Sequence, residues 1–119
     1  NVVDWLGPRR DVQDLMLNSD AFVLPTFREG FSRVLLEASA LGLPSITTNV
    51  PGTNEIVRHL QEGLHVDVDN SVNLANAMIQ LASDPKLTKR LGDNAKLHVE
   101  QFSLKVISDK YIELYKNTV

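Results

Sequence analysis

Short apolar runs recur along the chain, and each ends at a residue that favours a turn. They cover residues 2–6 before Gly7, 21–24 before Pro25, 45–48 before Asn49 and 64–68 before Asp69. Runs that are apolar over most of their length are typical of strands buried on both faces, as in a parallel sheet. The pattern predicts a parallel sheet of about four strands.

Helical patterns lie between the predicted strands. Each begins at a side chain that can accept a hydrogen bond from a free N–H group of the first helical turn. The predicted helices start at Asp11 with Val12, Leu15 and Met16 inward, at Ser32 through Leu41 with Gly42 and Pro44 as terminators, and at Asn54 around Ile56 and Val57. Alternation of strands and helices indicates an α/β fold with a Rossmann-like sheet and flanking helices.

A helical C-terminal segment begins at about residue 71, where apolar residues recur at intervals of three to four positions. Three helices are expected there, and the first two have polar N-caps. They are a helix from Asn70 or Ser71 with Leu74, Ala77, Met78 and Leu81 inward, one from Asp84-Pro85 with Leu87, Leu91, Ala95 and Phe102 inward, and one from about Leu104 with Ile107, Tyr111, Leu114 and Tyr115 on one face.

Composition narrows the possible functions. The 119 residues fit one domain, the net charge is −3 with scattered basic residues, and there is no cysteine. A basic patch for nucleic acid is therefore not expected, and neither is a disulfide or a thiolate metal site. His59, His65 and His98 fall in no metal-ligand spacing, so we interpret them as surface or core residues and expect no metal. No apolar run approaches the length of a transmembrane helix, and no signal-peptide pattern is seen.

The segment PTFREGF, residues 25–31, is predicted to connect a strand to a helix. In parallel sheets, ligands bind where such loops leave the carboxyl ends of the strands. The backbone N–H groups of residues 31–34 would lie in the first helical turn, at the positive end of the helix dipole. Such a turn is suited to phosphate, and Gly30 would let the backbone approach a ligand closely.

Two carboxylates flank this anion site. Glu29 lies in the loop, and Glu37 is the one charged residue between Val34 and Leu41. A carboxylate can accept hydrogen bonds from both hydroxyls of a ribose. Alternatively, Glu37 forms an ion pair with Arg33 on an exposed helix face, and spacing alone favours that interpretation. Glu29 taken alone is most often an ordinary loop carboxylate.

The segment VPGTNE, residues 50–55, is the next predicted strand-to-helix loop. Gly52 and Thr53 would bring further backbone donors beside the same crevice. A simple turn followed by an Asn54 cap explains the same residues equally well. From the residues alone, the sequence predicts a phosphate and hydroxyl site without a metal.

Residues 22–57, FVLPTFREGFSRVLLEASALGLPSITTNVPGTNEIV, resemble the C-terminal domain of retaining glycosyltransferases of the GT-B fold, in the group 1 or family 4 class. The family pattern joins Leu-Pro-Ser/Thr, Glu-Gly-Phe, Leu-Glu-Ala, Gly-x-Pro and Gly-x-x-Glu-Ile-Val. The flanking segments resemble the family too, so the likeness covers essentially residues 1–119. It implies a single partial GT-B C-terminal, donor-binding domain and overrides the ion-pair interpretation of Glu37.

The resemblance also implies roles for individual residues in binding a nucleotide-diphosphate sugar. Glu29 would be catalytic, near the reacting sugar carbon. The donor-binding residues would be Gly30, Phe31, Ser32, Arg33 and Val34 through their amides, Glu37 at the ribose, and Thr53 near the phosphates. Transfer would retain the anomeric configuration and need no metal or other cofactor, since helix dipoles and basic side chains stabilise the leaving diphosphate.

Some family features differ or are missing. Ser32 and Arg33 replace the frequent Gly-Leu or Gly-Asn, and with NVPG this variant looks most like transferases that build polysaccharide on lipid-linked carriers. By this resemblance, the family's N-terminal acceptor domain and its basic Arg and Lys pair would be expected upstream of residue 1. The resemblance therefore implies a chain that is inactive alone, from a cytoplasmic parent peripheral to the inner face of the membrane. Strands left without neighbours predict self-association.

Two alternatives remain at this point. The chain is also compatible with a non-catalytic nucleotide-binding or regulatory α/β module, although the clustered aspartates of a receiver domain are not evident. It is equally compatible with part of a GT-B fold sugar-nucleotide epimerase, whose acid and base residues would come from elsewhere in the parent. Neither the nucleotide base nor the sugar is predicted from the residues.

Overall fold

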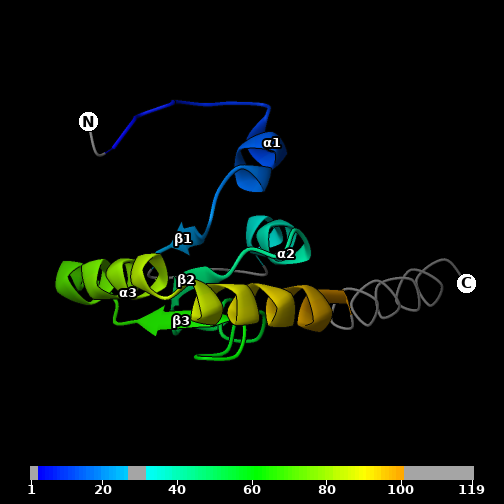
Figure 1. Ribbon diagram of the computed structural model, residues 1–119. Helices are drawn as coiled ribbons and strands as arrows, with labels where there is room; N and C mark the ends of the chain where they lie inside the picture. Colours follow the sequence, from blue (N-terminus) through cyan, green and yellow to red (C-terminus); the bar gives the residue numbers. More distant parts are fainter. Residues whose placement is uncertain (1–2, 27–31, 101–119) are drawn as a thin grey trace, which may run out of the picture.

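A parallel sheet lies at the centre of the computed structural model, which describes residues 3–26 and 32–100 (Figure 1). Its described strands are β1 (Phe22–Leu24), β2 (Ser45–Thr48) and β3 (Gly63–Val66), in the order β1-β2-β3. Val23 lies opposite Ile46, and Ile46 lies opposite Leu64. The predicted α/β fold with a parallel sheet is confirmed.

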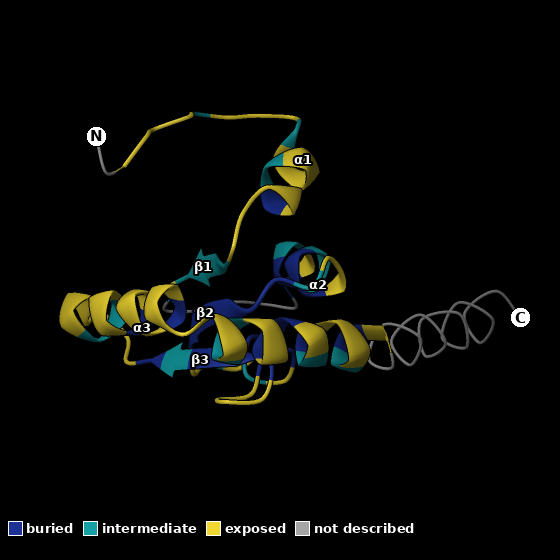
Figure 2. Ribbon diagram, in the orientation of Figure 1, coloured by how far each residue is buried: buried dark blue, intermediate teal, exposed yellow. Residues whose placement is uncertain are grey.

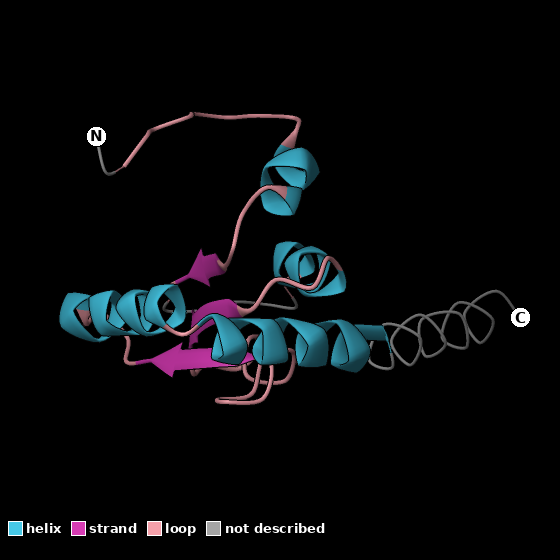
Figure 3. Ribbon diagram, in the orientation of Figure 1, coloured by secondary structure: helices cyan, strands magenta, loops and turns pink. Residues whose placement is uncertain are grey.

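Helices cover both faces of this sheet. α1 (Val12–Leu17) and α2 (Arg33–Ala40) pack together on one face, whereas α3 (Ser71–Ser83) and a helix over residues 85–100 pack on the other. β2 lies between these layers and is buried along its whole length, as Figure 2 shows. The long β2–β3 connection consists of turns and loop (Figure 3).

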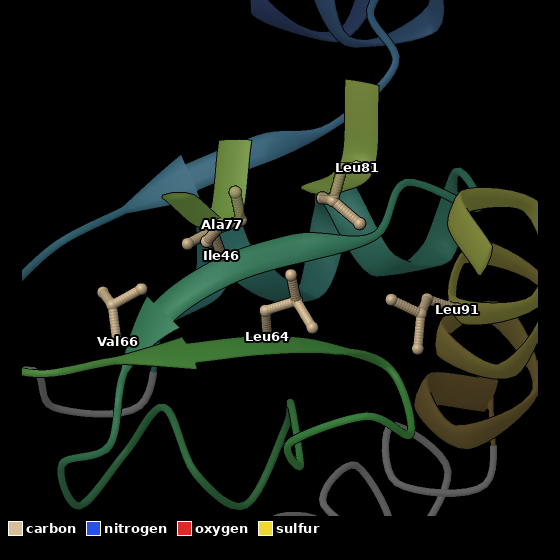
Figure 4. Packing of buried hydrophobic residues seen from close by; sticks show 6 residues of the cluster. All are labelled: Ile46, Leu64, Val66, Ala77, Leu81 and Leu91. Atoms are coloured by element: carbon tan, nitrogen blue, oxygen red, sulfur yellow. The ribbon is translucent and has the colours of Figure 1, made fainter. Parts of the chain in front are cut away.

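The main core cluster joins the sheet to the second helical layer. Ile46, Leu64 and Val66 point from β2 and β3 toward Ala77 and Leu81 of α3 and toward Leu91 of the next helix, as Figure 4 shows. Burying each large aliphatic side chain stabilises the fold by about 1.5–3 kcal/mol. This cluster fixes β2 and β3 and therefore the point where their loops begin.

The prediction of a strand at residues 2–6 is wrong for residues 3–6, which are the part of it that the structure describes. Residues 3–6 form no strand and belong to an extended arm, residues 3–10, that runs away from the sheet (Figure 1). Val3 and Trp5 are 81% and 92% exposed. An apolar run becomes a strand only where a neighbour pairs with its backbone, and β1 and β2 pair with each other instead.

Two strand boundaries also differ from the predictions. β1 starts one residue later than expected, and its three residues are half-buried rather than buried. β3 covers Gly63–Val66 instead of residues 64–68 because Asp69 adopts a positive φ of 57° in a turn, which exposes Val68. A residue in this left-handed conformation cannot continue a strand.

The helix predicted to start at Asn54 does not form. Residues 51–56 are turns, and the carbonyl of Thr53 accepts the N–H groups of Ile56 and Val57 at 3.1 and 2.9 Å. These bonds close one turn only. Ile56 and Val57 are nevertheless buried, against Leu35 of α2.

Three of the five polar residues predicted as N-caps do cap a helix, and no helix forms at Asn54. The side chains of Ser32, Asn70 and Asp84 accept hydrogen bonds from backbone N–H groups three residues later, at 3.2, 2.9 and 3.1 Å. Asp11 precedes α1 without capping it, because its carboxylate binds the guanidinium of Arg9 at 2.6 and 2.7 Å. These hydrogen bonds lower the pKa of Asp11 and raise that of Arg9.

Most predicted inward positions are buried, but two are exposed. Val12 and Met78 are 38% and 51% exposed, since they lie at the margins of their helical faces. The residues confirmed as buried or half-buried are Leu15, Met16, Leu74, Ala77, Leu81, Leu87, Leu91 and Ala95. Phe102 and the helix predicted from about Leu104 lie outside the described residues.

Two glycines allow backbones to touch. A Cβ at Gly92, on the 85–100 helix, would lie 2.2 Å from the carbonyl oxygen of Gly42, and one at Gly63 would lie 2.0 Å from that of Ser45. Contacts this short exclude any larger side chain. Gly42 itself has a φ of 80°, which ends α2 in a left-handed conformation that glycine adopts without strain.

A buried carboxylate ties the β2–β3 connection to the 85–100 helix. Glu62 is 1% exposed and accepts hydrogen bonds from the backbone N–H of Arg58 at 2.8 Å and from its guanidinium Nε at 3.1 Å. His98 Nδ1 lies 3.8 Å from Glu62 Oε1, and its Nε2 lies 3.0 Å from the carbonyl oxygen of Glu55. The hydrogen bonds to Glu62 raise the pKa of Arg58.

We expect Arg58→Ala to lower the free energy of unfolding by about 1–3 kcal/mol, since Glu62 would stay buried without its cation. Urea denaturation measures this change. Lys89→Ala is the matched control, because Lys89 and Asp93 form an equally spaced pair whose side chains are exposed. Its effect should stay below about 0.5 kcal/mol. Equal losses in the two variants would contradict the role assigned to Arg58 as the partner of the buried Glu62 carboxylate.

Candidate functional site

The candidate site is built from the connections that leave the carboxyl ends of β1 and β2. They are the β1–α2 loop, residues 25–32, and the β2–β3 loop, residues 49–62. Because β1 and β2 are parallel neighbours, both loops leave the same edge of the sheet. Predicted site residues Glu29, Gly30 and Phe31 lie outside the described residues.

The start of α2 follows the prediction. Ser32 is buried, and its hydroxyl accepts the N–H of Leu35, so this hydroxyl is committed to capping the helix. The N–H groups of Arg33 and Val34 lie in the first turn, where the helix itself supplies no acceptor. The side chain of Val34 packs against Met16, which leaves its backbone as the part able to bind a ligand.

Glu37 lies one turn into α2. Its position is compatible with both interpretations from the sequence, an ion pair with Arg33 and a carboxylate that can accept ligand hydroxyls. Its Oε1 is 4.0 Å from Arg33 Nε, with the two side chains 38% and 92% exposed. The ion pair of Glu37 with Arg33 thus forms, at the longest distance that counts as such a contact. A pair this long and exposed contributes about 0–1 kcal/mol, so the carboxylate keeps the capacity to accept ligand hydroxyls.

Thr53 is buried within the β2–β3 loop rather than exposed at its surface. Its hydroxyl donates to the carbonyl oxygens of Thr48 at 2.6 Å and Val50 at 2.9 Å, and its backbone N–H donates to Val50 as well. These contacts hold the turn that follows β2. The predicted place of Thr53 near the phosphates stays a prediction, and its described hydrogen bonds are with Val50 of its own loop and with Thr48 at the end of β2.

A pair of hydrogen bonds that was not predicted from the sequence joins the two loops. The Thr48 hydroxyl donates to the carbonyl oxygen of Thr26 at 2.5 Å and accepts the N–H of Thr26 at 3.3 Å. Thr48 ends β2, and Thr26 is the last described residue before residues 27–31. The available signal was the parallel register. Because Leu24 lies opposite Thr47, Thr26 and Thr48 follow that pair by two residues and one residue and come within reach of each other.

The histidines take part in hydrogen bonds of the fold. His65 Nε2 lies 2.6 Å from the carbonyl oxygen of Val57, and His59 Nδ1 accepts the N–H of His65 at 2.9 Å. Within residues 3–26 and 32–100, no three His, Cys, Asp or Glu side chains gather in a way that could hold a metal.

Within the same described ranges, none of the helices combines the length and the apolar character that crossing a bilayer requires.

Several known proteins share this arrangement. The structure of HepE from Anabaena in complex with UDP is 28% identical, with a TM-score of 0.86 over 97% of this chain and 32% of HepE. Its complex with UDP-glucose gives a TM-score of 0.87 over 98% of this chain and 33% of HepE. HepE, whose structures hold UDP and UDP-glucose, thus shares the fold of this chain.

Sequence relatives agree with the structural ones. N,N'-diacetylbacillosaminyl-diphospho-undecaprenol alpha-1,3-N-acetylgalactosaminyltransferase of Campylobacter jejuni is 32% identical over 117 residues, which cover 98% of this chain and 31% of the relative. N-acetyl-alpha-D-glucosaminyl L-malate synthase of Bacillus anthracis is 36% identical over 112 residues, which cover 93% and 29%. The chain thus spans roughly 30% of the length of these relatives. Residues 1–98 match the model of glycosyl transferases group 1, and the chain belongs to that family.

Proposed function

We propose that the chain is the donor-binding part of a retaining glycosyltransferase. The parent would move a sugar from a nucleotide-diphosphate sugar to a glycan or lipid-linked acceptor in polysaccharide biosynthesis. The observation that carries this proposal is the pair of strand-end loops joined beside the start of α2. The UDP and UDP-glucose complexes of HepE support a nucleotide-sugar donor, and the undecaprenol-linked substrate named for the Campylobacter relative supports a lipid-linked acceptor.

The donor would lie across the β1–α2 loop. The amides from Gly30 to Val34 would bind the diphosphate. Those of Arg33 and Val34 would add the positive end of the helix dipole, which supplies charge stabilisation without a metal. Glu37 would accept the ribose hydroxyls, and Glu29 would contact the sugar near its reacting carbon. Thr53 would bring the β2–β3 loop beside the phosphates.

The transfer itself exchanges one bond for another at the anomeric carbon. The bond from that carbon to the diphosphate oxygen breaks, the acceptor oxygen forms the new bond on the same face, and the acceptor proton passes to the departing diphosphate. Charge accumulates on the diphosphate as the bond breaks. Donors fixed around that oxygen therefore stabilise the transition state more than the bound donor.

The two alternative functions bind the same kind of ligand. A regulatory module would bind the nucleotide without any transfer by the intact parent, and an epimerase would change the configuration of the sugar without an acceptor. The names of the relatives, which are transferases and a synthase, favour sugar transfer. Product analysis with the intact parent separates the three.

We expect UDP, GDP or ADP sugars to bind this chain weakly, in the millimolar range, and Glu37→Ala to weaken the binding about tenfold through loss of a charged hydrogen-bond acceptor. NMR titration measures both affinities. Glu100→Ala is the control, because it removes an exposed carboxylate from the 85–100 helix. Equal affinity of Glu37→Ala and the unchanged chain would contradict the assignment of Glu37 to the ribose.

We also propose that the chain alone does not transfer sugar, because the acceptor site and part of the diphosphate site would belong to the rest of the parent. The measurement is incubation of the chain with nucleotide-sugar donors and lipid-linked acceptors, followed by product analysis. No glycosylated acceptor is expected. Turnover by the isolated chain would overturn this proposal.

We propose further that the chain self-associates through exposed strand edges. β1 pairs with β2 along one edge and is half-buried, while the arm presents Val3, Trp5 and Leu6 to solvent. Unpaired strand edges and exposed apolar segments both favour association between copies.

Light scattering should therefore give a mass that rises above 13.3 kDa with concentration. Trp5→Ser should shift this rise to higher concentration, because it removes the most exposed large apolar side chain of the arm. Met78→Ser, which changes an exposed apolar residue of α3, serves as the comparison. A strictly monomeric mass at high concentration would refute self-association.

A further inference from the structure

We infer that Thr48 is a positioning residue, whose hydroxyl holds the β1–α2 loop and the β2–β3 loop together so that they bind the donor as one unit. This inference rests on the proposed function. Thr48 touches no predicted ligand atom. Its effect would pass through the backbone of Thr26 and through the turn that Thr53 closes.

The hydrogen bonds at Thr48 run in two directions. Toward β1, the Thr48 hydroxyl binds both the N–H and the carbonyl oxygen of Thr26, so it fixes the peptide groups on either side of that residue. Toward the β2–β3 loop, the Thr48 carbonyl accepts the hydroxyl of Thr53. One residue at the end of β2 therefore binds the start of both loops.

The core does not require a hydroxyl here. Thr47 precedes Thr48 in the same strand, is fully buried, and its hydroxyl has no hydrogen-bond partner among the described residues. Ser45 shows the same arrangement two residues earlier. A β-branched shape is enough for strand packing, so the threonine hydroxyl matters at Thr48 through its contacts with Thr26.

Fixing Thr26 matters for ligand binding because Glu29 and Gly30 follow three and four residues later. A backbone that is already held by hydrogen bonds loses less entropy when a ligand orders it, and this applies to Thr26, the second residue of the loop. At its other end the loop passes into α2 through the Ser32 cap. The Thr48 hydroxyl and the Ser32 hydroxyl thus anchor the two ends of the same loop.

The test compares Thr48→Val, which keeps the shape and removes the hydroxyl, with Thr48→Ser, which keeps the hydroxyl. Thr47→Val is the matched control, because it removes a neighbouring buried hydroxyl that bonds to nothing in the described part of the chain. Amide NMR resonances of residues 26–34 are recorded without ligand and during titration with UDP. We expect Thr48→Val to move these resonances and weaken UDP binding about three- to tenfold, Thr48→Ser to restore both, and Thr47→Val to change neither.

Several results would overturn the inference. They are unchanged loop resonances in Thr48→Val, equal effects of Thr48→Val and Thr47→Val, or failure of Thr48→Ser to restore the loop. If the unchanged chain binds no UDP, donor binding by this chain fails, while the ligand-free resonances still decide the role of Thr48. If Thr48→Val does not fold, hydrogen exchange in the unchanged chain decides. The Thr26 amide should then be protected, and exchange as fast as in an unstructured peptide would overturn the inference.

Discussion

The structure depends on the complete burial of β2. All four of its residues pair with β3, the first three also pair with β1, and a helical layer packs on each face. Backbone groups buried this far from water must all find partners, so β2 fixes the register of β1 and β3 at once. The loops that build the candidate site begin where these strands end. Their positions therefore follow from the packing of β2.

The parts of the fold that depend on residues close together in the sequence were predictable. The bounds of β2 were predicted to the residue, because a short run rich in β-branched residues stands between a helix stop at Gly42 and the polar Asn49. Ser32 was predicted as a cap, since capping depends on residues one turn apart. Parts that depend on distant partners were not predictable. The arm has the composition of a strand but pairs with nothing described, and Arg9 competes for the carboxylate of Asp11.

In the candidate site too, some features were predictable from the sequence and others were not. The rule for parallel sheets, applied to the sequence, places the β1–α2 and β2–β3 loops at one edge, and the structure agrees. Roles for Glu29 and Glu37 came from the family resemblance, because spacing alone favoured an ion pair for Glu37. The Thr48 contact required the register of β1 against β2. Glu62 was also missed, since a carboxylate in a turn gives no sign in the sequence that it is buried under Arg58 and His98.

The exposed arm has a consequence for spectroscopy. The chain contains one tryptophan, Trp5, and it lies almost entirely in solvent on a segment outside the core. Its fluorescence emission is therefore that of a hydrated indole even while the sheet and helices are intact. The emission of this chain therefore depends on whether another surface covers the arm, and it does not change when the core folds or unfolds. A blue shift in that emission would mark contact with another surface.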